Sequence, residues 1–236
     1  MCQQPGRKKD REDITPKWSI RYLDEIGLGR PPAAILWICN PCNNWLNSNF
    51  ENPARDLLKP LMAGSPVELS IDEQIIVARW LAKTLLLRAL KDAEHPSRGP
   101  LPRVDRRQHA QRIVREVMDT ERPPADCLIY IGHFDETLPF EETSRDDLSY
   151  LTRILPPLSF KAQVNFGRLY CQMFIGGDGL PLIGGQLARA IDRLIPVWPQ
   201  RLDSATFPPA KSFSMWDRVL ITSRWSAESE PAYDGQ

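Results

Sequence analysis

Two cysteines separated by two residues, and followed at once by two asparagines, constrain this chain more than any other feature of its sequence. Cys39 and Cys42 open the pattern, and an apolar stretch with helical spacing follows it. Two thiolates at this spacing bind one tetrahedral zinc ion, with Zn–S bonds of about 2.3 Å. The amides of Asn43 and Asn44 fall in the first turn of the next helix, where they either cap it or ligate a second, catalytic metal. The simpler interpretation is a structural zinc knuckle with asparagine caps.

Composition narrows the class of protein but not its function. The 236 residues suit one mixed domain, or a small module joined to a larger one. Lys plus Arg and Asp plus Glu both total 30, so the net charge is zero and any affinity for DNA must come from a local patch. Five cysteines behind a charged N-terminus indicate a reducing, cytoplasmic setting. No apolar run reaches the 18 residues that a membrane span requires.

The segment before the cysteines begins with charges of both signs at residues 7–13. We expect a solvated loop there, and the alternative is a contact with DNA phosphates. That contact would use Arg7, Lys8, Lys9 and Arg11. A short helix is predicted after Pro16, and the apolar residues 33–38 predict a strand that leads into Cys39.

These residues, taken in order, resemble the HNH-endonuclease-related proteins of bacteria and phages. Those proteins carry C-x-x-C, then E-H-[IV]-x-P-x-W, then C-x-x-C-N-N with W-M-S-x-L-E. The residues that carry the resemblance are Glu12, Pro16, Trp18, Cys39, Cys42, Asn43, Asn44, Ser48 and Glu51. An A-x-W-x-x-K-T helix is matched further on by Ala78, Trp80, Lys83 and Thr84. The likeness is most specific over residues 12–84, and it weakens toward Val197, Trp198 and Pro199.

The resemblance implies a structural zinc and a nuclease-type site. Cys2, Cys39 and Cys42 would hold the zinc, and this sequence carries only Cys2 of the family's first cysteine pair. Glu12 or Asp13, with Asn43 or Asn44, would hold a Mg²⁺ or Mn²⁺ ion that stabilises the charge developing during phosphodiester hydrolysis.

One departure bears directly on catalysis. Asp13 stands where the family has its histidine, the general base that activates water. A carboxylate with a pKa of about 3.9 is a poorer base than an imidazole near 6.5. The resemblance therefore implies weakened or lost catalysis.

The helical middle of the chain shows clear boundary signals. A helix is predicted over residues 44–62, either kinked or divided near Asn52 because of Pro53, with Gly64 as its stop. Ser70 and Glu73 form a capping box that opens a buried helix over residues 71–93. On that helix we expect Trp80 in the core and Lys83 at the surface, the alternative being that both are site residues.

The second half changes character after a linker at residues 94–104. A helix over residues 105–119 presents arginines, which are either a solvated face or a phosphate-binding one. They are Arg106, Arg107, Arg112 and Arg115. Strands are predicted at residues 127–131 and, as one long or bulged strand, at residues 160–175, followed by a short helix at residues 187–195. His95, His109 and His133 are isolated from other metal ligands, so we expect them at the surface or in loops; the alternative is that His133 is a fourth zinc ligand.

We therefore expect an α+β protein. A zinc-stapled ββα, HNH-like module (residues 1–64) would pack on a helical region (65–122), followed by a sheet-bearing region (123–225) and a disordered tail (226–236). The expected function is an HNH-endonuclease-like one, either hydrolysing DNA or binding it with weakened catalysis. The alternative is a non-enzymatic, zinc-stabilised module whose C-terminal half binds a protein partner. Spacings typical of serine hydrolases, P-loop NTPases and Rossmann dehydrogenases are absent from the sequence.

Overall fold

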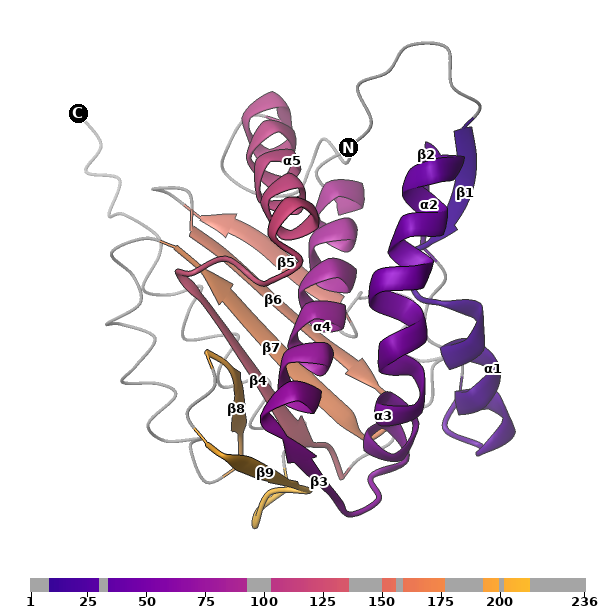
Figure 1. Cartoon of the computed structure of the whole chain (residues 1–236), viewed down its shortest axis with the longest axis vertical. Coiled ribbons are helices and arrows are strands. Elements are labelled where there is room, and N and C mark those ends of the chain that lie inside the picture. Colours follow the sequence, from indigo (N-terminus) through magenta and orange to yellow (C-terminus); the bar gives the residue numbers. More distant parts are fainter. Residues whose placement is uncertain are drawn as a thin grey trace, which may run out of the picture.

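A mixed sheet-and-helix architecture appears in the computed structural model, which describes residues 9–29, 34–92, 103–135, 150–155, 159–176, 193–199 and 202–212. The largest sheet is antiparallel, with strand order β5-β6-β7-β4-β8 (Figure 1). Its strands are β4 (Cys127–His133), β5 (Tyr150–Leu155), β6 (Ser159–Phe166), β7 (Leu169–Ile175) and β8 (Ile195–Trp198). The predicted α+β class is confirmed.

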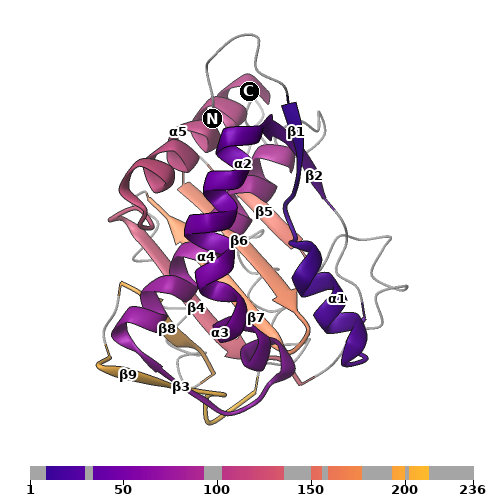
Figure 2. The same cartoon turned by 45° about the vertical axis from the view of Figure 1, so that its right-hand side comes forward.

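Helix α4 (Ile71–Asp92) runs through the centre of the molecule. The predicted capping box begins it: the Ser70 amide donates to the Glu73 carboxylate at 2.8 Å, and the Glu73 amide donates to Ser70 Oγ at 3.4 Å. Every residue at positions 81–90 is buried. The reason is that the sheet covers one side of α4 while other helices cover the opposite side (Figure 2).

A helical rod packs against α4 along its length. It comprises α2 (Asn40–Leu46), one π-helical turn, η1 (Asn47–Glu51), and α3 (Asn52–Ala63). The division near Asn52 and the stop at Gly64, whose φ is 75°, are as predicted. Helix α5 (Arg103–Thr120) packs beside α4 on its other flank (Figure 1).

The N-terminal part forms a two-stranded ribbon with a helix between its strands. Strand β1 (Lys9–Asp13) pairs antiparallel with β2 (Ile35–Cys39), and α1 (Lys17–Glu25) follows Pro16 as expected. The prediction of a loop is wrong over Lys9–Asp13. The charged run forms a strand because β2 offers it a ladder of backbone hydrogen bonds, and because the buried carboxylate of Glu12 meets a cation inside the protein.

The single strand predicted over residues 160–175 is also corrected. Gly167, at φ 59°, and Arg168 form a tight turn that separates β6 from β7, and the two strands pair antiparallel. A Cβ at Gly167 would lie 2.7 Å from the Met62 carbonyl oxygen, so only glycine fits this turn. The predicted helix at residues 187–195 lies mostly outside the described residues, and Ile195 begins strand β8.

The remaining sheet joins distant parts of the chain. Strand β3 (Val67–Ser70), just before α4, pairs antiparallel with β9 (Ser204–Phe207). No described helix is long and apolar enough to cross a membrane.

Candidate functional site

Three charged side chains from three separate elements meet in the interior, between the ribbon, the rod and α4. Glu12 comes from β1, Glu51 from the π-helical turn η1 and Lys83 from α4. Two indole rings, Trp18 of α1 and Trp80 of α4, complete the group. We call these five residues the buried ion cluster.

The hydrogen bonds of this cluster converge on Glu51. Its Oε2 accepts from Trp18 Nε1 at 3.0 Å and from Trp80 Nε1 at 3.1 Å. Its Oε1 pairs with the ammonium of Lys83, which also lies 3.1 Å from Glu12 Oε1. The two carboxylates therefore share one cation, and each oxygen of Glu51 has at least one charged or indole donor.

The electrostatics of the cluster are those of charges removed from water. Burial raises the pKa of Glu12 above its ordinary value, although the adjacent Lys83 ammonium opposes the rise. Burial lowers the pKa of Lys83, but the attractions of Glu51 and Glu12 together outweigh that effect and leave the pKa above its ordinary value. Lys83 is therefore a fixed positive charge. At Glu12, by contrast, burial disfavours the ionised carboxylate.

The surface position expected for Lys83 is wrong, since the residue is only 3% exposed. The core position expected for Trp80 is confirmed at 0% exposed. Residues 81–90 of α4 are all buried, so a lysine among them has no solvated face to reach and needs an internal counter-charge. Glu51 supplies one from the π-helical turn η1, where it is buried, and such turns are frequent at functional sites.

The other predicted catalytic residues surround the same strand but do not join the cluster. Successive residues of a strand point to opposite faces, so Asp13 faces outward where Glu12 faces inward. The Asp13 carboxylate pairs with Arg11 Nη2 at 3.0 Å and with Lys17 Nζ at 3.5 Å. Asn43, 9% exposed, donates from Nδ2 to the Arg11 carbonyl at 3.5 Å. The rod thus brings Asn43 against the strand that bears Glu12 and Asp13, as the sequence predicts.

The predicted zinc ligands are only partly described. Cys39 is buried at the end of β2, Cys42 is half-buried one helical turn later, and Cys2 lies outside the described residues. Both described thiols lie in the first turn of α2 or directly before it. Among the described residues no group of three or more His, Cys, Asp or Glu side chains is arranged to hold a metal ion.

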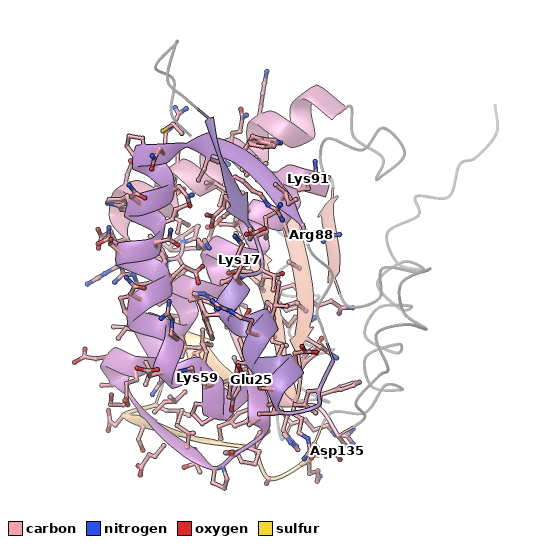
Figure 3. All side chains as sticks on the ribbon, turned by 90° about the vertical axis from the view of Figure 1, so that its right-hand side faces the viewer. Lys17, Glu25, Lys59, Arg88, Lys91 and Asp135 are labelled. Carbon is pink, nitrogen blue, oxygen red and sulfur yellow. The ribbon has the colours of Figure 1, made fainter. Side chains whose placement is uncertain are left out.

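His133 does not lie near these cysteines. Its Nε2 packs against Gly64, at the end of the rod opposite to the end at Cys39. The rod spans residues 40–63, so at 1.5 Å per residue its ends are about 35 Å apart. The proposal of His133 as a fourth zinc ligand is therefore wrong. The histidine instead lies with Nδ1 3.0 Å from Ser212 Oγ and 3.4 Å from Asp135 Oδ1, and Asp135 is at the lower end of the molecule in Figure 3.

The two carboxylates expected to bind a catalytic divalent cation are paired with cations in this structure. Glu12 is committed to Lys83, and Asp13 to Arg11 and Lys17. Because the two carboxylates face opposite sides of β1, they cannot ligate one ion together. The residues present suit zinc better than they suit the divalent cation, since Cys39 and Cys42 supply two thiolates at the required spacing.

The arginine face predicted on α5 is partly visible. Arg112 and Arg115 are exposed, and the side chains of Arg106 and Arg107 lie outside the description. Glu116 and Asp119 are exposed on the same helix, so the surface carries both signs. This mixture is typical of a solvated face.

Sequence reasoning missed the buried ion cluster as a unit, although each of its five residues lies in one of the motifs that carry the HNH resemblance. Comparisons with protein-family models, with characterised proteins and with solved structures find no match for this chain.

Proposed function

We propose that this chain is an HNH-endonuclease-like protein that binds DNA, and that its phosphodiester hydrolysis is weakened or lost. The contact between Asn43 Nδ2 and the Arg11 carbonyl supports the proposal, because it joins the amide after the cysteine pair to the strand of Glu12 and Asp13 across 32 positions. An HNH-like site requires this meeting of strand and helix.

The weakening of catalysis follows from the pairing of Asp13. A general base must be free to accept a proton from water, and the Asp13 carboxylate is held by two cations. General-base catalysis typically contributes about 10²–10⁴-fold to a rate, so its loss leaves slow nicking or none. Binding depends on cations rather than on a base, and Lys17, with 71% of its side chain exposed, lies at this surface.

Zinc, if bound, would be held by Cys39 and Cys42 together with Cys2. Its role there would be to fix the junction between β2 and α2, as structural zinc does in modules with small cores.

A nicking assay and a binding assay on the same protein test the proposal. We expect the chain to bind duplex or single-stranded DNA in a salt-dependent way and to nick plasmid DNA very slowly or not at all with Mg²⁺ or Mn²⁺. Asp13→His should restore nicking, and Asn43→Ala in the restored background should remove it again. Rapid cleavage that survives Asp13→Ala contradicts the assignment of the base. Absence of DNA binding at low salt, with an inert Asp13→His variant, favours the alternative of a non-enzymatic protein-interaction module.

A further inference from the structure

A tryptophan on the outer face of the β1–β2 ribbon has no packing role within the described part of the chain. Trp37 is 64% exposed, more than any other large hydrophobic residue described; the others are Ile26 at 38%, Ile71 at 44% and Leu202 at 45%. Burial of an indole in the core would stabilise the fold, so its exposure on a short strand is typical of a binding surface.

The register of the ribbon fixes what lies beside this ring. Trp37 is directly opposite Arg11, and alternation along the strands places Arg11, Asp13 and Trp37 on the same outer face. Leu36 and Glu12, the next pair along, point inward. The ring therefore lies beside Arg11, whose side chain is 50% exposed.

Positive charge exceeds negative charge around the ring. Arg11 on β1 and Lys17 on α1 are exposed, and both pair with the Asp13 carboxylate. Figure 3 shows Lys17 on the side of the molecule that carries the ribbon and α1. Arg11 and Lys17 against Asp13 leave a net positive charge here, which is complementary to phosphate.

We infer that the ribbon face formed by Arg11, Lys17 and Trp37 binds single-stranded nucleic acid, with an unpaired base stacked on Trp37 and adjacent phosphates on the cations. A flat π surface flanked by cations is the combination that recognises unpaired bases without regard to sequence. In a duplex the base faces are already stacked on one another, so a ring on a surface strand cannot reach them. The inference rests on the proposed DNA binding and names the form of DNA that this face selects.

The test measures two affinities for each variant of the full chain. A fluorescently labelled oligothymidylate, which has no secondary structure of its own, is compared with a labelled duplex of equal length by anisotropy. Trp37→Ala should weaken oligothymidylate binding by about 5- to 150-fold, which is the affinity that stacking of one base typically contributes. The same substitution should change duplex binding by less than about twofold. Trp37→Phe should retain most of the affinity because it keeps an aromatic face.

Two further variants serve as controls. Ile71→Ala removes an exposed apolar side chain at the start of α4, far from the ribbon, and should change neither affinity. Lys17→Ala should weaken both and lower the slope of log affinity against log salt by about one, as expected for a phosphate contact.

The outcomes separate this inference from the proposed function. If duplex and oligothymidylate bind but Trp37→Ala changes neither affinity, or both equally, the stacking role is overturned while DNA binding stands. If neither nucleic acid binds at low salt, the proposed function fails and this inference with it. If Trp37→Ala instead changes the oligomeric state in gel filtration, the face is a protein contact and the inference is overturned.

Discussion

Glu51 and Lys83 form an ion pair inside the core, where their side chains are 4% and 2% exposed and lie 32 positions apart in the chain. Removing one partner of such a pair leaves an uncompensated buried charge, which costs far more than the pair itself contributes. The same ammonium lies 3.1 Å from Glu12 Oε1, so carboxylates from the ribbon and from the rod share one cation of α4. The cluster thereby makes the position of β1 depend on α4.

Lys83→Met should destabilise the protein by about 3–5 kcal/mol, the cost of breaking a buried ion pair. Urea unfolding at neutral pH measures it. The matched control is Lys59→Met, which removes a surface lysine paired with Asp56 at 3.1 Å and should cost less than about 1 kcal/mol. Equal effects of the two substitutions would contradict the burial of Lys83. Adding Glu12→Gln to Lys83→Met should recover part of the loss, because one unpaired carboxylate is then removed.

Glu12 should give the stability of the protein a pH dependence of defined sign. Its pKa in the folded protein is raised above the ordinary 4.5, so the folded state binds this proton more tightly than the unfolded chain does. The contribution of Glu12 is therefore greatest below pH 4.5 and is lost as the pH rises through the folded pKa.

Glu12→Gln should flatten the decline in stability over that window, as measured by urea unfolding at a series of pH values from 4.5 upward. Glu68→Gln, at an exposed position on β3, serves as the control and should leave the pH profile of the unmodified protein unchanged. A wild-type profile that rises across this window, and that Glu12→Gln flattens, would show that the shift has the opposite sign.

The helical half of the fold could be read from the sequence because its signals are local. The capping box at Ser70, the glycine stop at Gly64 and the proline near Asn52 each act within one helical turn. Strand β1 could not be read in this way, since a run of alternating charges becomes a strand only when a distant partner, β2, supplies its hydrogen bonds. The turn at Gly167 was missed for a similar reason: apolar residues on both sides, buried on both faces of the sheet, give no alternation to mark where one strand ends.

The candidate site shows the same limit. Asn43 was expected beside β1, because the strand that leads directly into the helix of Asn43 pairs with β1. Lys83 was misplaced because its partners lie 32 and 71 positions away, and sequence spacing carries no information about such pairs. One signal was present: the apolar residues of α4 lie on more than one face, so a lysine in the middle of this helix has little water to reach.

Trp80 should matter both for packing and for its hydrogen bond to Glu51. Trp80→Ala should cost about 3–5 kcal/mol through the cavity it leaves. Trp80→Phe keeps most of the ring but removes the Nε1 donor from a buried carboxylate, which should cost about 1.5–3 kcal/mol. Trp18→Phe removes the other indole donor to the same oxygen from a more exposed position and should cost less. Equal losses for the two phenylalanine variants in urea unfolding would contradict the difference in burial.

Zinc content tests the cysteine pair. We expect about one zinc per purified chain, bound more weakly than in a complete four-cysteine site, and a lower melting temperature after treatment with a chelator. Cys39→Ser and Cys42→Ser should each lose the metal. Cys171→Ser is the control: burial raises the pKa of that thiol well above its ordinary value, so it stays protonated and should leave the zinc content unchanged. A zinc-free, folded protein whose Cys39→Ser and Cys42→Ser variants keep their melting temperature would remove the basis for this site.

Two glycines with the same backbone conformation should respond very differently to alanine. Gly27 and Gly64 have φ of 73° and 75°, so alanine at either position costs about 1–2 kcal/mol for the left-handed conformation. A Cβ at Gly27 meets nothing within 4 Å, whereas a Cβ at Gly64 lies 2.6 Å from His133 Nε2 and 2.8 Å from Arg168 Cδ. Gly64→Ala should therefore cost about 1–3 kcal/mol more than Gly27→Ala, because the imidazole is itself buried and cannot move aside freely. Urea unfolding of both variants measures the difference, and His133→Ala in the Gly64→Ala background should recover part of it. Similar losses at the two glycines would show that the rod does not end against His133.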